Sequence, residues 1–73
     1  MTPTQLRKTI TAYQERHQLP SFTRALEAFA AELNQPTMPV RAASVWAWLR
    51  GARGIREAVA ARINAINKAT EKS

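Results

Sequence analysis

The sequence predicts a compact all-α domain built from four helices. Apolar residues recur at helical spacings of three and four along most of the chain, and no segment alternates between apolar and polar residues with a period of two. Fourteen residues are alanine, the strongest helix former. A length of 73 residues allows a single domain, residues 1–73, with 19 apolar side chains larger than alanine available for its core.

The first two helices have clear start signals. We expect the first over about residues 3–17, because Thr2 can cap its first turn and Pro3 suits its first helical position. Pro20 ends it, since a proline disfavours helix in the residue before it. Ser21 is the expected cap of a second helix over about residues 21–34. The apolar stripes of these two helices are Leu6, Ile10 and Tyr13, and then Phe22, Leu26, Phe29, Ala30 and Leu33.

Prolines and glycines divide the second half of the chain. Pro36 and Pro39 interrupt the segment after the second helix, so residues 35–38 are expected to form a loop. A third helix is predicted over about residues 41–50, closed by Gly51 and Gly54, and a fourth over about residues 55–69. The polar tail, residues 70–73, is expected to be frayed. The apolar stripes here are Val45, Trp48 and Leu49, and then Ile55, Val59, Ile63 and Ile66.

Several classes of function have no support in the composition. The chain has no cysteine, a lone His17 and five separated glutamates, so it offers no disulfide, no metal site and no catalytic pair. We therefore expect no cofactor and no enzymatic activity. No apolar run approaches the roughly 18 residues of a membrane span, and the N-terminal residues lack the apolar stretch of a signal peptide. These features predict a soluble cytoplasmic protein with no membrane partner.

Charge is the most informative property of the composition. Eleven Lys and Arg residues against five acidic residues give a formal net charge of +6, and eight of the eleven are arginine. Arginine binds phosphates through a planar fork of donors, whereas lysine acts as a point charge. A basic excess of this kind in a small domain is typical of nucleic-acid binding, and an acidic protein surface is the alternative partner.

A motif in the second half of the chain carries a resemblance to a known family. The segment Val40-Arg41-Ala42-Ala43-Ser44-Val45-Trp46-Ala47-Trp48-Leu49-Arg50-Gly51 resembles the turn and recognition helix of Cro- and repressor-like phage helix-turn-helix transcriptional regulators. Those proteins typically have a valine in the turn, then a valine, a tryptophan and a closing glycine, as at Val40, Val45, Trp48 and Gly51 here. The resemblance covers about residues 25–66. It implies a helix-turn-helix-like centre, double-stranded DNA as the partner, binding as a homodimer and, for a phage protein, the cytoplasm of a bacterial host.

The expected binding residues lie on the third helix and just after it. Arg41 and Ser44 are expected to read base edges, and Ala47 can contact a thymine methyl group. Three arginines follow at intervals of three residues across the glycine turn and are expected to bind backbone phosphates: Arg50, Arg53 and Arg56.

Trp46 has two open interpretations. It lies two residues from Trp48, which is about 200° around a helix, so both indoles cannot point into the core. Trp46 therefore either covers the flank between two helices or is exposed as an aromatic contact for a partner or a second copy.

A protein-binding regulator is the second interpretation of the whole chain. Leu33 lies seven residues before Val40, so the turn is extended by five residues, two of them prolines, relative to the proteins that the motif resembles. The alanines at positions 42, 43 and 47 also cannot hydrogen-bond a base edge. Both features favour a basic surface that, with Trp46, docks on an acidic or apolar patch of the transcription machinery, such as host RNA polymerase.

Overall fold

Four α-helices make up most of the chain in the computed structural model, which describes the backbone of residues 1–72 and the side chains of residues 1–69. They are α1 (Pro3–Arg16), α2 (Phe22–Leu33), α3 (Ala42–Leu49) and α4 (Glu57–Lys72). Across residues 1–72 no strand forms, and one isolated bridge joins Gln35 to Met38. The predicted all-α, four-helix fold is therefore confirmed. None of these helices is both long and apolar enough to cross a membrane.

The fourth helix corrects two of the predicted boundaries. It begins at Glu57 rather than at residue 55, because Ile55 and Arg56 follow Gly54 in non-helical backbone and Ile55 packs there against the core. The helix then continues to Lys72, past the expected end at residue 69, since no glycine or proline stops it. The tail that was expected to be frayed is thus helical over residues 70–72, and Ser73 lies outside the described residues. The other three helices match their predicted ranges to within one residue at each end.

Side-chain caps fix the starts of the first two helices, as the sequence predicts. The Thr2 hydroxyl accepts a hydrogen bond from the Gln5 amide at 3.2 Å, and the Gln5 side chain accepts one from the Thr2 amide at 2.9 Å. This reciprocal capping box satisfies two amides at the start of α1. Ser21 caps α2 by accepting from the Arg24 amide at 3.2 Å.

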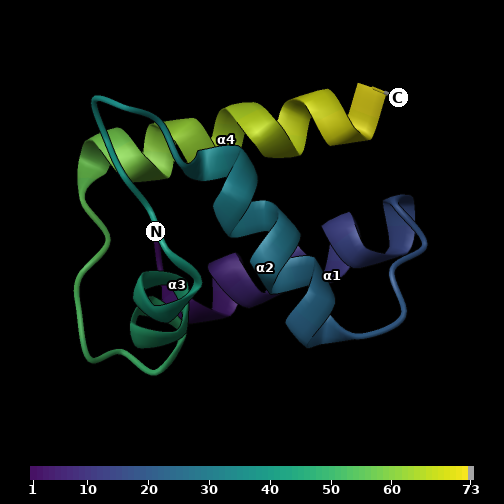
Figure 1. Cartoon of the computed structure of the whole chain (residues 1–73), viewed down its shortest axis with the longest axis horizontal. Helices are drawn as coiled ribbons and strands as arrows, with labels where there is room; N and C mark the ends of the chain where they lie inside the picture. Colours follow the sequence, from purple (N-terminus) through teal and green to yellow (C-terminus); the bar gives the residue numbers. More distant parts are fainter. Residues whose placement is uncertain (73) are drawn as a thin grey trace.

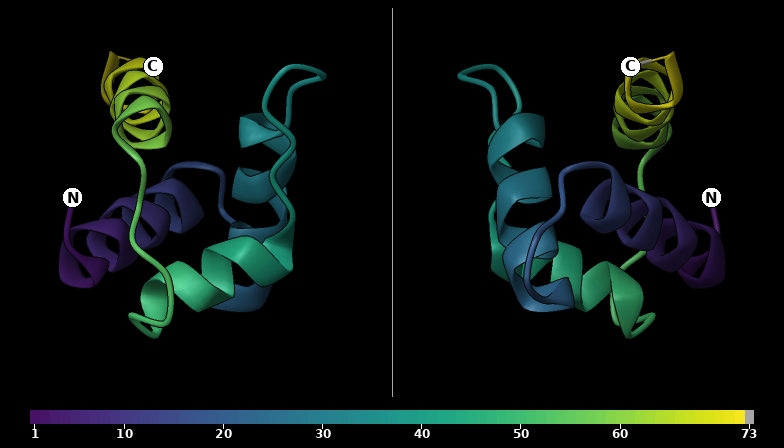
Figure 2. Two further views of the ribbon diagram at one scale, coloured as in Figure 1. Left: turned by 90° about the vertical axis from the view of Figure 1, so that its left-hand side faces the viewer. Right: turned by 90° about the vertical axis from the view of Figure 1, so that its right-hand side faces the viewer.

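The helix α1 is the central packing element of the fold. It packs against each of the other three helices, whereas α4 makes its principal helix contact with α1. Figure 1 shows α4 along one side of the molecule, and α3 is seen there nearly end-on, so its axis is steeply inclined to that of α2. In Figure 2, α4 and α2 stand on opposite sides, and α1 and α3 close the space between and below them.

The core collects one apolar face from every helix. Phe29 of α2 lies fully buried, with its ring edge-on to Tyr13 of α1 at a centroid distance of 5.4 Å. Val40, from the link between α2 and α3, is also buried. The remaining large core side chains are Leu6 and Ile10 of α1, Leu26 and Leu33 of α2, Val45, Trp48 and Leu49 of α3, and Val59, Ile63 and Ile66 of α4.

The link between α2 and α3, residues 34–41, confirms the predicted extended turn and adds a feature that the sequence did not indicate. The Asn34 side-chain oxygen accepts a hydrogen bond from the Val40 amide at 3.0 Å, which brings the two ends of the link together. Between them, Gln35 and Met38 exchange backbone hydrogen bonds at 3.2 and 3.0 Å and close a tight turn. Figure 2 shows this turn projecting beyond the end of α2. Residues 35–39 therefore form an excursion to the side of the link. Through the hydrogen bond between Asn34 and Val40, α2 is connected to α3 by three residues, Asn34, Val40 and Arg41.

A partly buried hydrogen bond connects α1 to α2. The Tyr13 hydroxyl donates to a Glu32 carboxylate oxygen at 2.8 Å, and the tyrosine itself is buried. Burial raises the pKa of Tyr13 to about 12, and the hydrogen bond to Glu32 and its negative charge act in the same direction. All three effects favour the neutral phenol, since ionisation would place a second negative charge beside the carboxylate.

We predict that Tyr13 ionises only near pH 12 in the folded protein. It is the only tyrosine in the chain, so tyrosinate absorbance reports its pKa directly. Because the pKa is raised from 10.0 on folding, the stability that Tyr13 contributes is complete below about pH 10 and is lost as the pH rises through about 12. Glu32→Gln should lower the measured pKa but leave it above 10, because burial is the largest cause. A wild-type pKa near 10 would contradict the Tyr13–Glu32 contact.

Candidate nucleic-acid interface

The outward face of α3 consists of small residues that end in an arginine. Ala43 and Arg50 are exposed and Ala47 is half-buried, and their spacing of four and then three residues places them on one side of the helix. The opposite side, Val45, Trp48 and Leu49, is buried in the core. No long side chain therefore stands between the middle of α3 and an approaching surface.

Trp48 and Trp46 occupy different environments, as their angular separation requires. Trp48 is buried in the core, as predicted. Trp46 is half-buried on the flank of α3, where its indole meets the Phe22 ring edge-on at a centroid distance of 6.0 Å. The Arg7 guanidinium lies 5.3 Å from the centre of the same Phe22 ring. Trp46, Phe22 and Arg7 thus connect α3, α2 and α1. Of its two interpretations, Trp46 thus matches the one in which it covers the flank between helices.

The arginines around α3 are all exposed. Arg41 is the N-cap residue of α3 and makes no capping hydrogen bond with its side chain, and Arg50 is the C-cap residue. Arg53 and Arg56 lie in the connection to α4. Residues 33–56 contain these four arginines and no acidic residue, so the segment around α3 carries a net charge of +4 at neutral pH. This segment therefore favours the binding of anions.

Gly51 ends α3 and sets the direction of the chain that carries Arg53 and Arg56. It has a φ of 73°, the left-handed conformation that a residue with a Cβ adopts at a cost. Its amide donates to the Trp48 carbonyl at 3.1 Å, and the Ala52 amide donates to the Ala47 carbonyl at 3.0 Å. These hydrogen bonds satisfy the last carbonyls of the helix and turn the chain sharply away from its axis.

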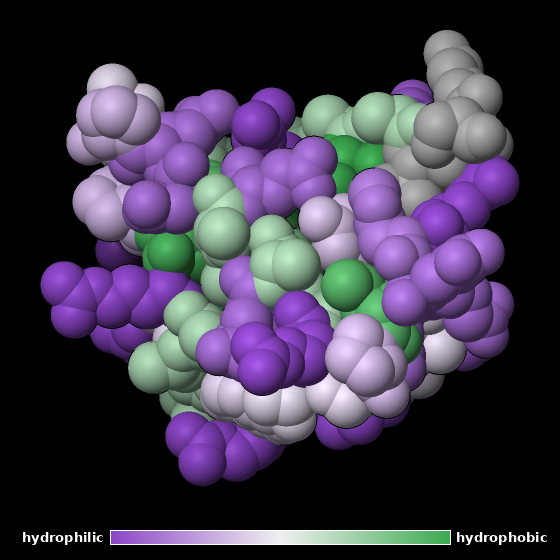
Figure 3. All heavy atoms as spheres, turned by 45° about the vertical axis from the view of Figure 1, so that its right-hand side comes forward, coloured by the Kyte–Doolittle hydropathy of each residue, from purple (hydrophilic) through white to green (hydrophobic). Residues whose placement is uncertain are grey.

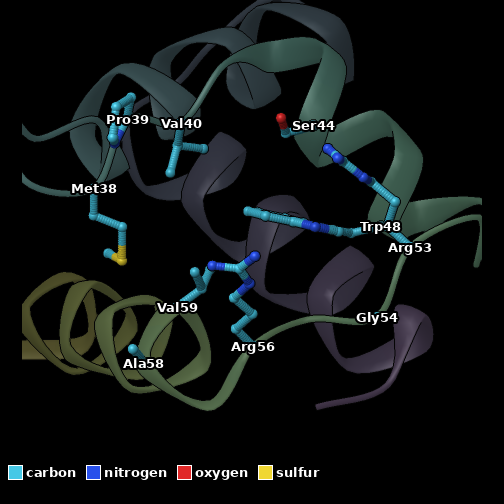
Figure 4. Close-up of a pocket in the computed structure, with 10 residues that line it drawn as sticks. All are labelled: Met38, Pro39, Val40, Ser44, Trp48, Arg53, Gly54, Arg56, Ala58 and Val59. Atoms are coloured by element: carbon cyan, nitrogen blue, oxygen red, sulfur yellow. The ribbon is translucent and has the colours of Figure 1, made fainter.

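A pocket lies beside α3 and gathers residues from separate parts of the sequence. It has a volume of about 540 Å³ and opens between α3, the start of α4 and the link 34–41; we call it the α3–α4 pocket. Figure 4 shows Trp48 across its middle, Arg56 pointing in from the start of α4, and Arg53 reaching along α3 toward Ser44. Of the predicted site residues, the structure thus brings together Ser44, Arg53 and Arg56, whereas Arg41 and Arg50 lie at the two ends of α3.

Several residues at this site were not singled out by the sequence. Met38 lines the pocket, although nothing in its surroundings along the chain indicates a role. The Arg7 guanidinium rests on the Phe22 ring. Asn34, whose only sequence signal is its place before the prolines, holds the link closed. Each of these roles depends on a partner distant in sequence.

The rest of the described surface offers no metal site. In the part of the chain with described side chains, no three His, Cys, Asp or Glu residues lie close enough to hold a metal ion. His17 is the exposed C-cap residue of α1, the position favoured by the helix dipole, and its ring lies 4.3 Å from that of Tyr13. Figure 3 shows a mixed face, with small apolar areas set among hydrophilic side chains.

Comparison with protein families, with curated proteins and with solved structures found no match.

We predict that substitution by alanine affects the free energy of unfolding differently at the two glycines that follow α3. Gly51→Ala should lower the free energy of unfolding by about 1 kcal/mol, because alanine must adopt a left-handed conformation there. Gly54→Ala should change it little, because Gly54 does not have a positive φ and an added Cβ would meet no atom within 4 Å. Denaturant unfolding of both variants measures the difference. Equal destabilisation by the two substitutions would contradict the proposed role of Gly51 in closing α3.

Proposed function

We propose that the chain is a small DNA-binding transcription regulator that inserts α3 into the major groove of double-stranded DNA. The observation that carries the proposal is the outward face of α3, where two alanines are followed by an arginine and a second arginine precedes the helix. A recognition helix needs such a face, since it must approach the base edges closely and contact them near its N-terminus.

The geometry of the link between α2 and α3 supports this proposal. Helix-turn-helix units join their two helices by a turn of about three or four residues. The link here contains eight residues, 34–41. The hydrogen bond from the Val40 amide to Asn34 joins its two ends, so that residues 35–39 project away from the connection between the helices. The chain that connects α2 to α3 can therefore act as a short turn, so the inserted residues are no obstacle to this mode of binding.

The proposed contacts divide into base reading and phosphate binding. Arg41, at the N-terminal end of α3, would read a base edge, and Ala43 and Ala47 would contact thymine methyl groups. Ser44 lies on the flank of α3 that faces the α3–α4 pocket, so it contributes less to base reading than the sequence suggested. Phosphates would be bound by Arg50, Arg53 and Arg56, which are exposed on the segment that follows Trp48.

An eight-residue recognition helix reads few bases, which favours binding as a homodimer on two half-sites. Doubling the contact would double both the number of bases read and the number of phosphates neutralised. Each phosphate neutralised contributes about −0.9 to the slope of log affinity against log salt concentration.

We predict that the full chain selects specific duplexes from a randomised library and binds them with an affinity that falls steeply as salt rises. Arg41→Ala should relax the sequence preference and weaken binding to the selected duplex by about 1–3 kcal/mol, because a base contact is lost. Arg53→Gln should weaken all duplexes alike and reduce the salt slope by about 1 per bound chain. Fluorescence anisotropy titrations at several salt concentrations measure both effects.

Arg24→Gln is the matched control for these arginine variants. Arg24 is an exposed arginine of α2, outside the segment around α3, and its removal should leave the sequence preference unchanged. A selection that enriches no duplex, or an Arg41→Ala variant with an unchanged preference, would overturn the proposal.

A protein of the transcription machinery, such as host RNA polymerase, is the second candidate partner. It is favoured by the two alanines on the outward face of α3, which offer no hydrogen-bonding group to a base but could pack against an apolar patch of a protein. The exposed arginines beside them would pair with acidic residues of that protein. Affinity capture from a host lysate, run beside the duplex selection, separates the two candidates. Capture of RNA polymerase that is lost in Arg50→Glu, with no duplex enriched, would favour this second function.

A further inference from the structure

The α3–α4 pocket is larger than the proposed DNA contact requires. Phosphate binding would use the guanidinium groups of Arg53 and Arg56 but would leave the interior of the pocket empty. A volume of about 540 Å³ falls in the range of about 300–1,000 Å³ that is typical of small-molecule sites. The size of this interior is therefore not explained by phosphate binding.

The polar groups of the pocket are suited to an anion. Arg53 and Arg56 both line it, Ser44 adds a hydroxyl, and no carboxylate lines it. Among the residues whose side chains are described, neither arginine forms an ion pair with a glutamate. Figure 4 shows the two guanidinium groups on either side of the Trp48 ring. A guanidinium group without a carboxylate partner can bind an oxyanion through forked, charge-assisted hydrogen bonds.

The remaining walls of the pocket are apolar. Met38 and Val40 line it from the link 34–41, Trp48 from α3 and Val59 from α4. Val40, Trp48 and Val59 belong to the core, so this wall is held in place by packing. Met38, which is half-buried, has an unbranched side chain that adapts to differently shaped ligands. An apolar body rather than a bare ion is therefore the complement of this interior.

We infer that the α3–α4 pocket binds a small organic anion, in which a carboxylate or phosphate head is joined to an apolar or aromatic body. The head pairs with Arg53 and Arg56 and with the Ser44 hydroxyl. The body packs against the edge of Trp48, Met38 and Val59. Neither part of such a ligand binds well alone, because Arg53 and Arg56 are exposed to water and the apolar walls give no charge-assisted hydrogen bond.

The site also suggests how such a ligand would regulate the protein, and this step rests on the proposed function. Arg53 and Arg56 cannot pair with the ligand head and with DNA phosphates at the same time. Ligand and duplex therefore weaken each other's binding, and the weakening is reciprocal. In this account the pocket is the effector site of the regulator.

Trp48 provides a direct test in the absence of DNA. In a Trp46→Phe protein, Trp48 is the only tryptophan, and the phenylalanine keeps a ring beside Phe22. Phenylbutyrate, a carboxylate on an aromatic body, should then change the Trp48 emission in a saturable way. Phenylbutanol, which has the same body without the charge, should need a concentration at least about tenfold higher. Calorimetric titration of the wild-type protein gives the same affinities without relying on fluorescence.

Two variants test where the ligand binds. Arg53→Gln combined with Arg56→Gln should weaken phenylbutyrate by about tenfold or more, because the charge-assisted hydrogen bonds are lost. Arg24→Gln combined with Lys68→Gln removes the same charge from other exposed positions and should leave the affinity unchanged. Ala58→Phe, at an exposed residue that lines the pocket, should abolish binding by filling it and preserve the helical circular dichroism.

The results that would overturn the inference are equally definite. They are no saturable binding by calorimetry, equal affinity for phenylbutyrate and phenylbutanol, or undiminished binding by folded Ala58→Phe. The regulatory step is tested by adding phenylbutyrate to the complex with a selected duplex, which should release DNA from the wild-type protein. A protein that binds phenylbutyrate but selects no duplex would retain the pocket inference and lose the proposed function, so the two failures are distinguishable.

Discussion

One side-chain hydrogen bond, from the Val40 amide to Asn34, sets the geometry on which the candidate interface depends. It closes the link between α2 and α3, and Val40 next to it is buried in the core. The start of α3 is thereby fixed relative to α2, although five residues separate the two ends of the closure in sequence. The bond is partly buried, so losing the Asn34 acceptor would cost up to about 1–3 kcal/mol, the penalty of a buried amide without a partner. That is a large share of the stability of so small a domain. The closure therefore determines where Arg41 and the outward face of α3 lie.

The packing of the buried face of α3 determines which residues form its outward face. Val45, Trp48 and Leu49 hold the helix against the core, which leaves Ala43, Ala47 and Arg50 facing outward. Trp48 also lines the α3–α4 pocket, so a ligand there would touch the same side chain that positions the helix. Because α4 is held mainly by α1, one wall of the pocket belongs to an element packed less extensively than the others. The proposed DNA contact, the proposed ligand site and the core thus share a small set of side chains in this chain of 73 residues.

Helix caps and apolar stripes were predictable from sequence, but the contacts between residues of different helices and loops were not. Thr2 and Ser21 act as helix caps as expected, and the apolar stripes are buried except for the half-buried Phe22 and Ile55, because caps and stripes depend on neighbours within one or two turns. Ile55 was placed in α4 since it fits the stripe, but it packs on the core from non-helical backbone. The ring contact of Trp46 with Phe22 and the placing of Met38 and Val59 around one pocket arise only from tertiary packing. The assignment of binding roles to the arginines remains a prediction.

Removing the excursion tests most directly whether the link acts as a short turn. In the variant, residues 35–39 are replaced by one glycine, which can span the distance between Asn34 and Val40 because their side-chain contact already brings them together. The measurement is the free energy of unfolding by denaturant, followed through helical circular dichroism. We expect a cooperative helical protein within about 2 kcal/mol of the parent, the loss being that of Met38 packing. An unfolded chain, or a transition that is no longer cooperative, would show that the excursion holds α3 in place and would contradict the account.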